Sequence, residues 1–259
     1  MLRRKLKKLI NLFGYDLINL KVRKPHTTFE IIYYLLDIIL KDKKTFTMFD
    51  VGSNETAEFC NEIQKNYLFK KIDKIVSEFY LFEPNKLLLE KLKKKNKDKK
   101  IYNFGLGAIK EEKNFYIHES HVKSSFLKVD QNYFHNNKNK YQINEEIVKI
   151  ETLDNFCFDN DIKYIDFLKI DTQGYNAKVI EGAKDLVKNN KIGLIYSEIT
   201  IGKKYEISES FYDFEKILKD NYLLYGIDIG NNLVNVVSRR YSTELNLDVF
   251  YINKKFIEN

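Results

Sequence analysis

Short apolar runs alternate with segments of helical spacing along most of the chain. The runs that begin at Thr45, Glu78, Lys100, Tyr164 and Ile192 are typical of buried strands. Between them, apolar residues recur three or four positions apart, which predicts amphipathic helices. These helices are expected over residues 56–66, 85–97, 177–190 and 211–221. The alternation predicts an α/β fold, a mostly parallel central sheet with helices on both faces.

The chain closes with two further strand-like runs, residues 222–230 and 247–254. No clear helix joins them, so they can pair directly with opposite directions. We therefore expect an antiparallel edge strand on the otherwise parallel sheet.

Two segments depart from the alternation and define the predicted domain organisation. Residues 1–45 are expected to form an N-terminal helical extension, with a basic amphipathic helix over 1–13 and a second helix capped by Thr27 or Thr28. The rest, 46–259, is the sheet domain, with a strand and loop insertion at about 108–164.

The basic helix over residues 1–13 has two interpretations. It can lie on an anionic membrane surface, or it can pack on its own domain or on a second subunit. We favour packing, and the pattern leaves open both a peripheral membrane contact and a homodimer.

Composition narrows the class of protein. The formal net charge of +7 could indicate an anionic partner, but the many Lys, Asn and Ile residues explain it without nucleic acid. The two cysteines, Cys60 and Cys157, are too few for a disulfide framework or a zinc cluster. No apolar run reaches the roughly 18 residues of a membrane span, and the N-terminus lacks a cleavable signal pattern. We therefore expect a cytoplasmic protein.

The stretch TMFDVGSN places Asp50 and Gly52 at the carboxyl end of the first strand, and Glu83 ends the second. Ligands of open α/β sheets bind beyond these strand ends, and a carboxylate ending the second strand can accept both hydroxyls of a ribose. A dinucleotide would need more glycines after Gly52, and Glu55 adds negative charge where phosphates would lie. S-adenosylmethionine carries no phosphate and suits the loop better than NAD.

Several motifs resemble the FkbM family of S-adenosylmethionine-dependent methyltransferases. They are DVGSN, LFEP, NFGLG, and above all KIETLDNF followed by IDFLKIDTQGYNAKVIEGA. The similarity extends from about Phe46 to about Glu198. It implies a Rossmann-like class I methyltransferase fold, S-adenosyl-L-methionine as cofactor, and an acceptor that is often a hydroxyl of a sugar or natural product.

The chain also departs from the family pattern. Thr56 replaces the second glycine of the first motif, and Gln173 and Asn176 replace two glutamates of the last. Any metal-binding or proton-accepting capacity of those glutamates is reduced here, whereas Asp171 is retained. We expect no required metal, because no His, Cys and Asp spacing resembles a metal site.

Strand positions and the resemblance together give a set of candidate residues. The cofactor is expected to contact Asp50, Gly52, Ser53, Asn54, Glu83, Gly105 and Asp171. The acceptor is expected to contact His121, Ser124, Gln173 and Glu198.

Two residues are candidates for the catalytic base that takes the proton of the acceptor hydroxyl. Asp171 ends the fourth strand, where it can also hold the ammonium of the cofactor, and His121 lies in the polar insertion. Lys169, on the same strand face as Asp171, is expected to pair with Asp171 or Glu198 if it is buried.

The leading functional hypothesis is an O-methyltransferase acting on a carbohydrate, either nucleotide-linked or part of a surface polysaccharide. An RNA methyltransferase is the alternative suggested by the net charge, although no aromatic stacking platform or appended RNA-binding module is visible. A cofactor-binding protein without catalysis is the third hypothesis, suggested by Thr56 and Asn176.

Overall fold

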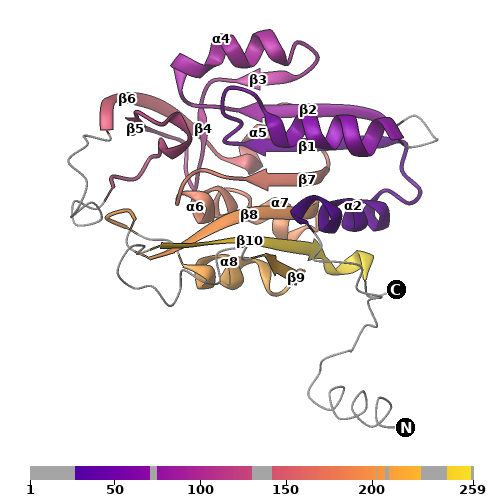
Figure 1. Cartoon of the computed structure of the whole chain (residues 1–259). Coiled ribbons are helices and arrows are strands. Elements are labelled where there is room, and N and C mark those ends of the chain that lie inside the picture. Colours follow the sequence, from indigo (N-terminus) through magenta and orange to yellow (C-terminus); the bar gives the residue numbers. More distant parts are fainter. Residues whose placement is uncertain are drawn as a thin grey trace.

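A computed structural model of the chain describes residues 27–70, 75–129, 142–202, 204–207, 210–228 and 244–257. Figure 1 shows a central sheet with helices on both faces and a smaller sheet at one side. The helices are α2 (Thr28–Ile39), α3 (Glu58–Glu62), α4 (Lys86–Lys95), α5 (Leu153–Asp159), α6 (Asn176–Glu181), α7 (Lys184–Lys188) and α8 (Phe211–Leu218). The strands are β1 (Thr45–Val51), β2 (Val76–Phe82), β3 (Lys100–Tyr102), β4 (Gly105–Leu106), β5 (Glu111–His118), β6 (Gln142–Glu151), β7 (Ile165–Ile170), β8 (Ile192–Gly202), β9 (Tyr222–Asp228) and β10 (Glu244–Asn253).

The large sheet has the strand order β3-β2-β1-β7-β8-β10-β9. The strands from β3 to β8 are parallel, whereas β10 runs antiparallel to both β8 and β9. The predicted mostly parallel sheet with an antiparallel pairing at its edge is confirmed. The order of strands reverses between β1 and β7, which is the switch point where such sheets bind ligands.

Three predicted elements are each divided in the structure. The helix expected over 56–66 consists of α3 and a π-helix, η1 (Ile63–Tyr67). The single helix expected over 177–190 is two helices, α6 and α7, which are separated at Gly182. Gly182 lies against the backbone of Gly107, where a Cβ would come within 2.0 Å of the carbonyl oxygen. The single strand expected from Lys100 is divided into β3 and β4, which belong to different sheets. Asn103 turns the chain there by donating hydrogen bonds to the carbonyls of Glu83 and Pro84.

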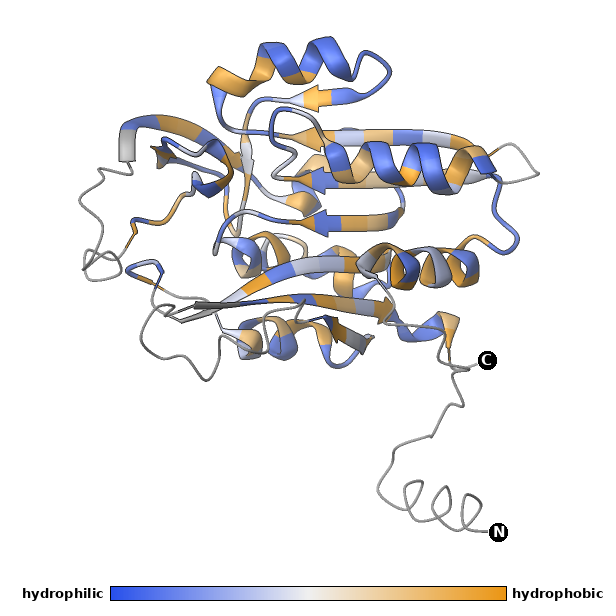
Figure 2. Cartoon of the chain, viewed as in Figure 1, coloured by the Kyte–Doolittle hydropathy of each residue, from blue (hydrophilic) through white to orange (hydrophobic). Residues whose placement is uncertain are grey.

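Side chains alternate between two apolar cores, one on each face of the large sheet. On β1, Phe49 and Val51 face the core beneath α5 to α8, and Phe46 and Met48 face the core beneath α2 and α3. Figure 2 shows hydrophobic bands along the central strands. Asp50 shares the face of Met48, so its carboxylate lies between the sheet and the α2/α3 layer.

Helix α2 packs on the sheet as part of this second core. It begins with a capping box between Thr27 and Glu30, as the sequence predicted for Thr27, and it buries four aliphatic residues. Burial of each such side chain contributes about 1.5–3 kcal/mol to the stability of the folded state. The basic segment 1–13 lies outside the described residues, and among those described no helix is long and apolar enough to cross a membrane.

The predicted insertion contains β5 and β6 and the short 3₁₀ helix η3 (His121–Lys123). These two strands form the smaller sheet, of order β4-β6-β5, together with β4, which lies just before the insertion. The small sheet has its own core, in which Phe115 and Phe126 pack against Tyr175 of the main domain. Part of the polar stretch 133–144 lies outside the described residues.

Candidate active site

A pocket lies at the carboxyl ends of β1, β2 and β7, beside the switch point of the sheet. Its empty volume, open solvent included, is about 680 Å³. Eight of the predicted site residues line it: Gly52, Asn54, Glu83, Gly105, His121, Ser124, Asp171 and Gln173. The pocket lining does not include Asp50, Ser53 or Glu198.

Gly52 lies in close contact with the backbone of Asp171. Its φ is +83°, and a Cβ at this position would lie 1.9 Å from the backbone oxygen of Asp171. Its N–H donates to the carbonyl of Phe82 at 2.9 Å. Only glycine combines this φ with this proximity, so the residue joins the ends of β1, β2 and β7 into one pocket floor.

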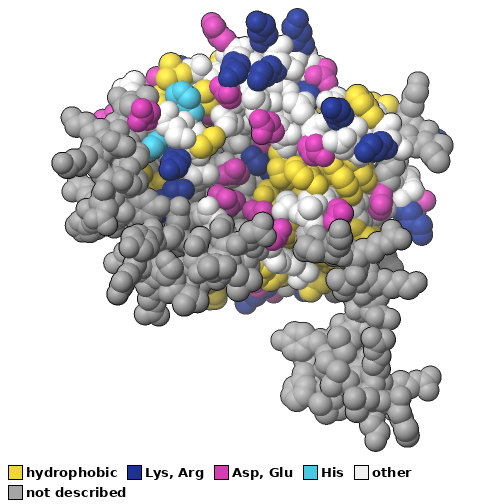
Figure 3. Space-filling model, viewed as in Figure 1, with side chains coloured by type: hydrophobic (Ala, Val, Ile, Leu, Met, Phe, Trp, Pro, Cys, Tyr) yellow, Lys and Arg dark blue, Asp and Glu magenta, His cyan; other side chains and the backbone are white. Residues whose placement is uncertain are grey.

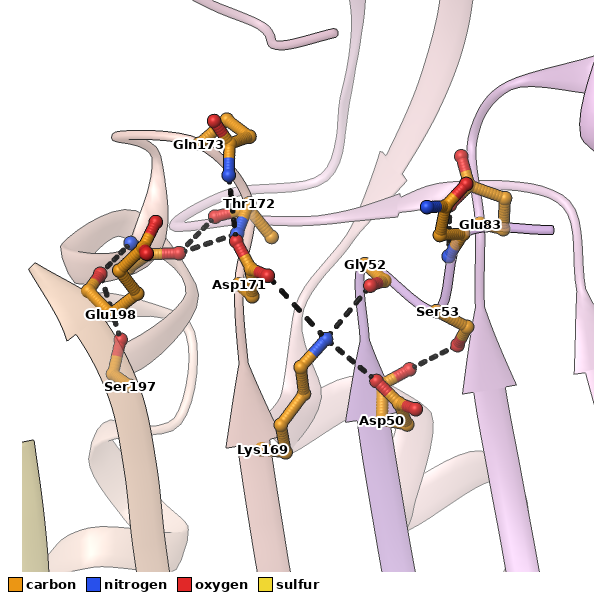
Figure 4. A network of polar contacts seen from close by, with 12 residues as sticks. Asp50, Gly52, Ser53, Glu83, Lys169, Asp171, Thr172, Gln173, Ser197 and Glu198 are labelled. Atoms are coloured by element: carbon orange, nitrogen blue, oxygen red, sulfur yellow. Dashed lines mark hydrogen bonds and ion pairs between the residues drawn. The ribbon is translucent and has the colours of Figure 1, made fainter. Parts of the chain in front are cut away.

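A buried ion pair lies beneath that floor. The Lys169 ammonium is 2.9 Å from Oδ1 of Asp50 and donates to the carbonyl of Gly52 at 2.8 Å, while Oδ2 of Asp171 is 3.9 Å away. Figure 4 shows Lys169 pointing at all three groups. The predicted ion pair of Lys169 with Asp171 is confirmed, and the sequence missed the nearer partner, the buried Asp50.

The electrostatics of this pair favour a protonated lysine. Burial raises the pKa of the Asp50 carboxyl, and the attraction of Lys169 opposes this rise. Burial alone would lower the pKa of Lys169, but Asp50 and Asp171 outweigh it and the net pKa is raised. Asp50 and Ser53, whose hydroxyl donates to the carbonyl of Asp50 at 2.7 Å, therefore support the pocket from behind.

Glu83 joins the two loops on the other side of Gly52. Its Oε2 accepts from the N–H of Asn54 at 2.8 Å, and its Oε1 accepts from the N–H of Asn85 at 2.9 Å. Burial raises the pKa of this carboxyl to about 7, although the two backbone hydrogen bonds oppose the shift. Each carboxylate oxygen keeps a second lone pair, so Glu83 can still accept hydroxyl groups from a ligand.

The turn after β7 supplies the opposite wall. The side chain of Asp171 is 36% exposed, and its Oδ1 accepts from Nε2 of Gln173 at 3.0 Å. Asn176 holds the turn from below: its Oδ1 accepts from the Thr172 N–H at 2.6 Å, and its Nδ2 donates to the carbonyl of Glu198 at 2.5 Å. The amide at position 176 is thus a structural link, which both donates and accepts where a carboxylate could only accept.

The insertion covers the pocket with η3 and the start of the small sheet. Nδ1 of His121 lies 3.5 Å from Nδ2 of Asn85, at the N-terminus of α4. Oγ of Ser124 accepts from the N–H of His118 at 3.1 Å, so this hydroxyl is partly occupied. Gly105 lies against Phe126, where a Cβ would come within 2.4 Å of the ring.

Sequence reasoning missed the apolar wall and the supporting amides. Four phenylalanines line the pocket: Phe82, Phe104, Phe115 and Phe126. Phe82 and Phe104 belong to the motifs LFEP and NFGLG, so membership of a motif could have indicated them. Phe115 and Phe126 reach the pocket only through the folding of the insertion, for which the sequence carries no signal.

The pocket therefore combines an apolar aromatic wall, one buried carboxylate and one partly exposed carboxylate. Such a set suits a ligand with an aromatic base, a hydroxylated ring and a cationic end. Among the residues that the structure describes, no group of three or more His, Cys, Asp or Glu side chains is placed to hold a metal ion.

Comparison with known proteins is consistent with this chemistry. A family model described as the methyltransferase FkbM domain matches residues 50–224. No curated protein sequence matches the chain.

Solved structures that match the chain include an rRNA methylase from Streptococcus thermophilus, at 9% identity and a TM-score of 0.42, covering 89% of this chain and 99% of that one. The METTL16 MTase domain is similar at 11% identity and a TM-score of 0.43, covering 94% and 76%. M. capricolum TrmK in complex with S-adenosyl-homocysteine is similar at 12% identity and a TM-score of 0.37, covering 89% and 70%.

Proposed function

The chain belongs to the family of methyltransferase FkbM domains, and from this premise we propose that it transfers a methyl group from S-adenosylmethionine to a hydroxyl of a carbohydrate. The observation that carries the proposal is the pocket at the switch point, with Glu83 on one side of Gly52 and Asp171 on the other. A dependence on S-adenosylmethionine follows from the family, whereas the acceptor is our inference.

The residues present fit this cofactor. Gly52 lets the backbones at the ends of β1 and β7 meet at the pocket floor, and Glu83 has lone pairs for the ribose hydroxyls. The phenylalanine wall suits the adenine ring, and Asp171 suits the ammonium of the methionine end. When bound, the cofactor supplies a methyl group activated on a sulfonium sulfur.

On the acceptor side, the protein has to align a hydroxyl and take its proton. Asp171 and His121 both line the pocket, and each can accept a proton as the new carbon–oxygen bond forms and the carbon–sulfur bond breaks. Ser124 and Gln173 add polar groups of the kind that orient sugar hydroxyls. These groups, together with the resemblance to a family that often methylates sugars, support a carbohydrate acceptor.

An RNA acceptor is the competing function, and one surface feature favours it. In Figure 3, Lys side chains gather over α4, which begins beside the pocket. Exposed lysines in this region include Lys86, Lys93, Lys94 and Lys95. They form a solvated helix face that would suit any polyanion, so they do not identify RNA.

The decisive experiment incubates the purified protein with S-adenosylmethionine carrying a labelled methyl group. One arm contains a panel of nucleotide-linked sugars and polysaccharide fragments, and a second contains cellular RNA at low and at physiological salt. We expect label in a sugar. Label in RNA alone, together with binding that survives physiological salt, would replace the carbohydrate by RNA. Cofactor binding without label in either arm would favour a protein that has lost catalysis.

A further inference from the structure

The turn after β7 is clamped by two segments that are distant in sequence. Gln173 has φ +53° and Gly174 has φ +86°, so the backbone is left-handed at both positions. The carbonyl of Gln173 accepts from Oγ of Ser125, in the insertion, at 2.8 Å. Tyr205, from the segment after β8, packs so tightly that a Cβ on Gly174 would lie 2.7 Å from its ring.

The Gln173 side chain connects two charged groups across this turn. Its Oε1 accepts from Nζ of Lys204 at 3.0 Å, and its Nε2 donates to Oδ1 of Asp171 at 3.0 Å. A lysine ammonium can only donate hydrogen bonds, so the amide oxygen has to face Lys204. The amide NH₂ group is thereby turned towards Asp171. Lys204 thus fixes the orientation of the Gln173 side chain, which Figure 4 shows above Asp171.

We propose that Gln173 is a positioning residue. Its amide is polarised by Lys204, and the hydrogen bond that it donates holds the Asp171 side chain ionised and in one orientation. Lys204 is 6% exposed, so water screens its charge weakly and the amide between the two groups is strongly polarised. Oδ1 of Asp171 accepts the hydrogen bond from this amide, whereas Oδ2 lies 3.9 Å from the Lys169 ammonium. Oδ2 is therefore the oxygen that we assign to a ligand in the pocket. This inference rests on the proposed function, because it assigns Asp171 to the cationic end of the methyl donor.

Replacement of the amide by a carboxylate provides a test with a defined sign. In Gln173→Glu, two carboxylates would lie about 3 Å apart, and such a pair retains a proton to higher pH than one carboxylate does. Lys204, about 3 Å from the new Glu oxygen, attracts its negative charge more strongly than Lys169 attracts that of Asp171 at 3.9 Å, so the proton resides on Asp171. Asp171 then loses its attraction for an ammonium as the pH falls.

Other titratable and charged groups around Asp171 are the same in both proteins. From the strands these are Lys169, Asp50, Tyr196 and Asp248, and across the pocket they are Glu83 and His121. Their effects cancel when the variant is compared with the wild-type protein at each pH.

The experiment measures the Kd of S-adenosylhomocysteine by calorimetry for wild-type protein and Gln173→Glu, at about pH 8 and pH 5.5. This product carries the same ammonium as the methyl donor. We expect the ratio of the variant's Kd to the wild-type Kd to be near one at pH 8 and about tenfold or more at pH 5.5. Gln173→Met, which is similar in size and cannot titrate, should weaken binding by the same factor at both pH values.

The outcomes separate the inference from the function on which it rests. A Gln173→Glu ratio that stays constant with pH would overturn the positioning role, as would a Gln173→Met protein that binds as tightly as wild type. Wild-type protein that gives no binding heat at either pH would instead refute the proposed function. Circular dichroism of each variant checks that it is folded, and Lys204→Met should remove the pH dependence of the ratio when combined with Gln173→Glu.

Discussion

Cofactor binding should strengthen as the pH rises through neutrality, because of Glu83. Burial raises the pKa of this carboxyl to about 7 in the ligand-free protein. Ribose hydroxyls donate hydrogen bonds, so they bind the ionised carboxylate in preference to the acid. The ionised fraction rises from about 3% at pH 5.5 to about 90% at pH 8, so affinity should rise about thirtyfold, or about 2 kcal/mol.

The stability of the ligand-free protein should change in the opposite direction. The pKa of Glu83 is raised from a reference of 4.5, so its contribution favours folding at low pH and is lost as the pH rises towards 7. Between pH 5.5 and pH 8 this loss amounts to about 2 kcal/mol of unfolding free energy. Because of Glu83, we therefore expect tighter cofactor binding at the same high pH at which the ligand-free protein is less stable.

Titration calorimetry with S-adenosylhomocysteine from pH 5.5 to pH 8 measures the first effect, and urea unfolding of the ligand-free protein measures the second. At pH 7, buffers of different ionisation heat should reveal release of about half a proton on binding. Glu83→Gln is the matched variant and should lose both pH dependences, whereas His121→Ala should keep them. Flat affinity across this range, without proton release, would refute the assigned contact between Glu83 and the ribose.

Two further substitutions test the rest of the site. Lys169→Met should cost about 3–5 kcal/mol of unfolding free energy, because it leaves Asp50 charged and buried without its partner; a cost below 1 kcal/mol would contradict the ion pair as a structural element. Once an acceptor is known, loss of the catalytic base should lower kcat roughly a hundred- to ten-thousandfold, so Asp171→Asn and His121→Ala should differ if only one of them is the base. Full kcat in both variants would leave alignment alone to explain the reaction.

The sequence predicted the sheet and the position of the pocket because both follow from local patterns. The strand before Asp50 and Gly52 is recognised by its apolar run and by the glycine that follows it. Parallel strands then bring their carboxyl ends to one edge of the sheet. For the same reason Glu83 and Asp171 could be assigned to the pocket before any contact was known.

The contacts that tune these residues could not be predicted. Lys204 lies 31 positions from Gln173 in the sequence, and no sequence pattern predicts that the two side chains form a hydrogen bond. Glu198 was expected at the end of a strand, but β8 continues to Gly202; Glu198 contributes its carbonyl to Asn176 and does not line the pocket. Alternation gives the face on which a side chain lies, whereas its partner depends on how separate segments pack.

The loop after β1 also explains why a dinucleotide should not bind. A pyrophosphate is held by backbone N–H groups that point out of such a loop. Here the N–H groups of Gly52 and Ser53 both donate to the carbonyl of Phe82, that of Asn54 donates to Glu83, and that of Glu55 donates to the Asn54 side chain. The amides that a phosphate would need already have acceptors within the protein.

The charges in the pocket also disfavour the binding of a dinucleotide. Glu83 and Asp171 would lie near an anionic pyrophosphate, whereas the positive charge of Lys169 is directed at Asp50 beneath the floor. NAD should therefore give no binding heat at concentrations at which S-adenosylhomocysteine saturates the protein, and it should not displace that ligand. Displacement by NAD at comparable concentration would show that the loop can release its amides, and the preference for a cationic methyl donor would then need another origin.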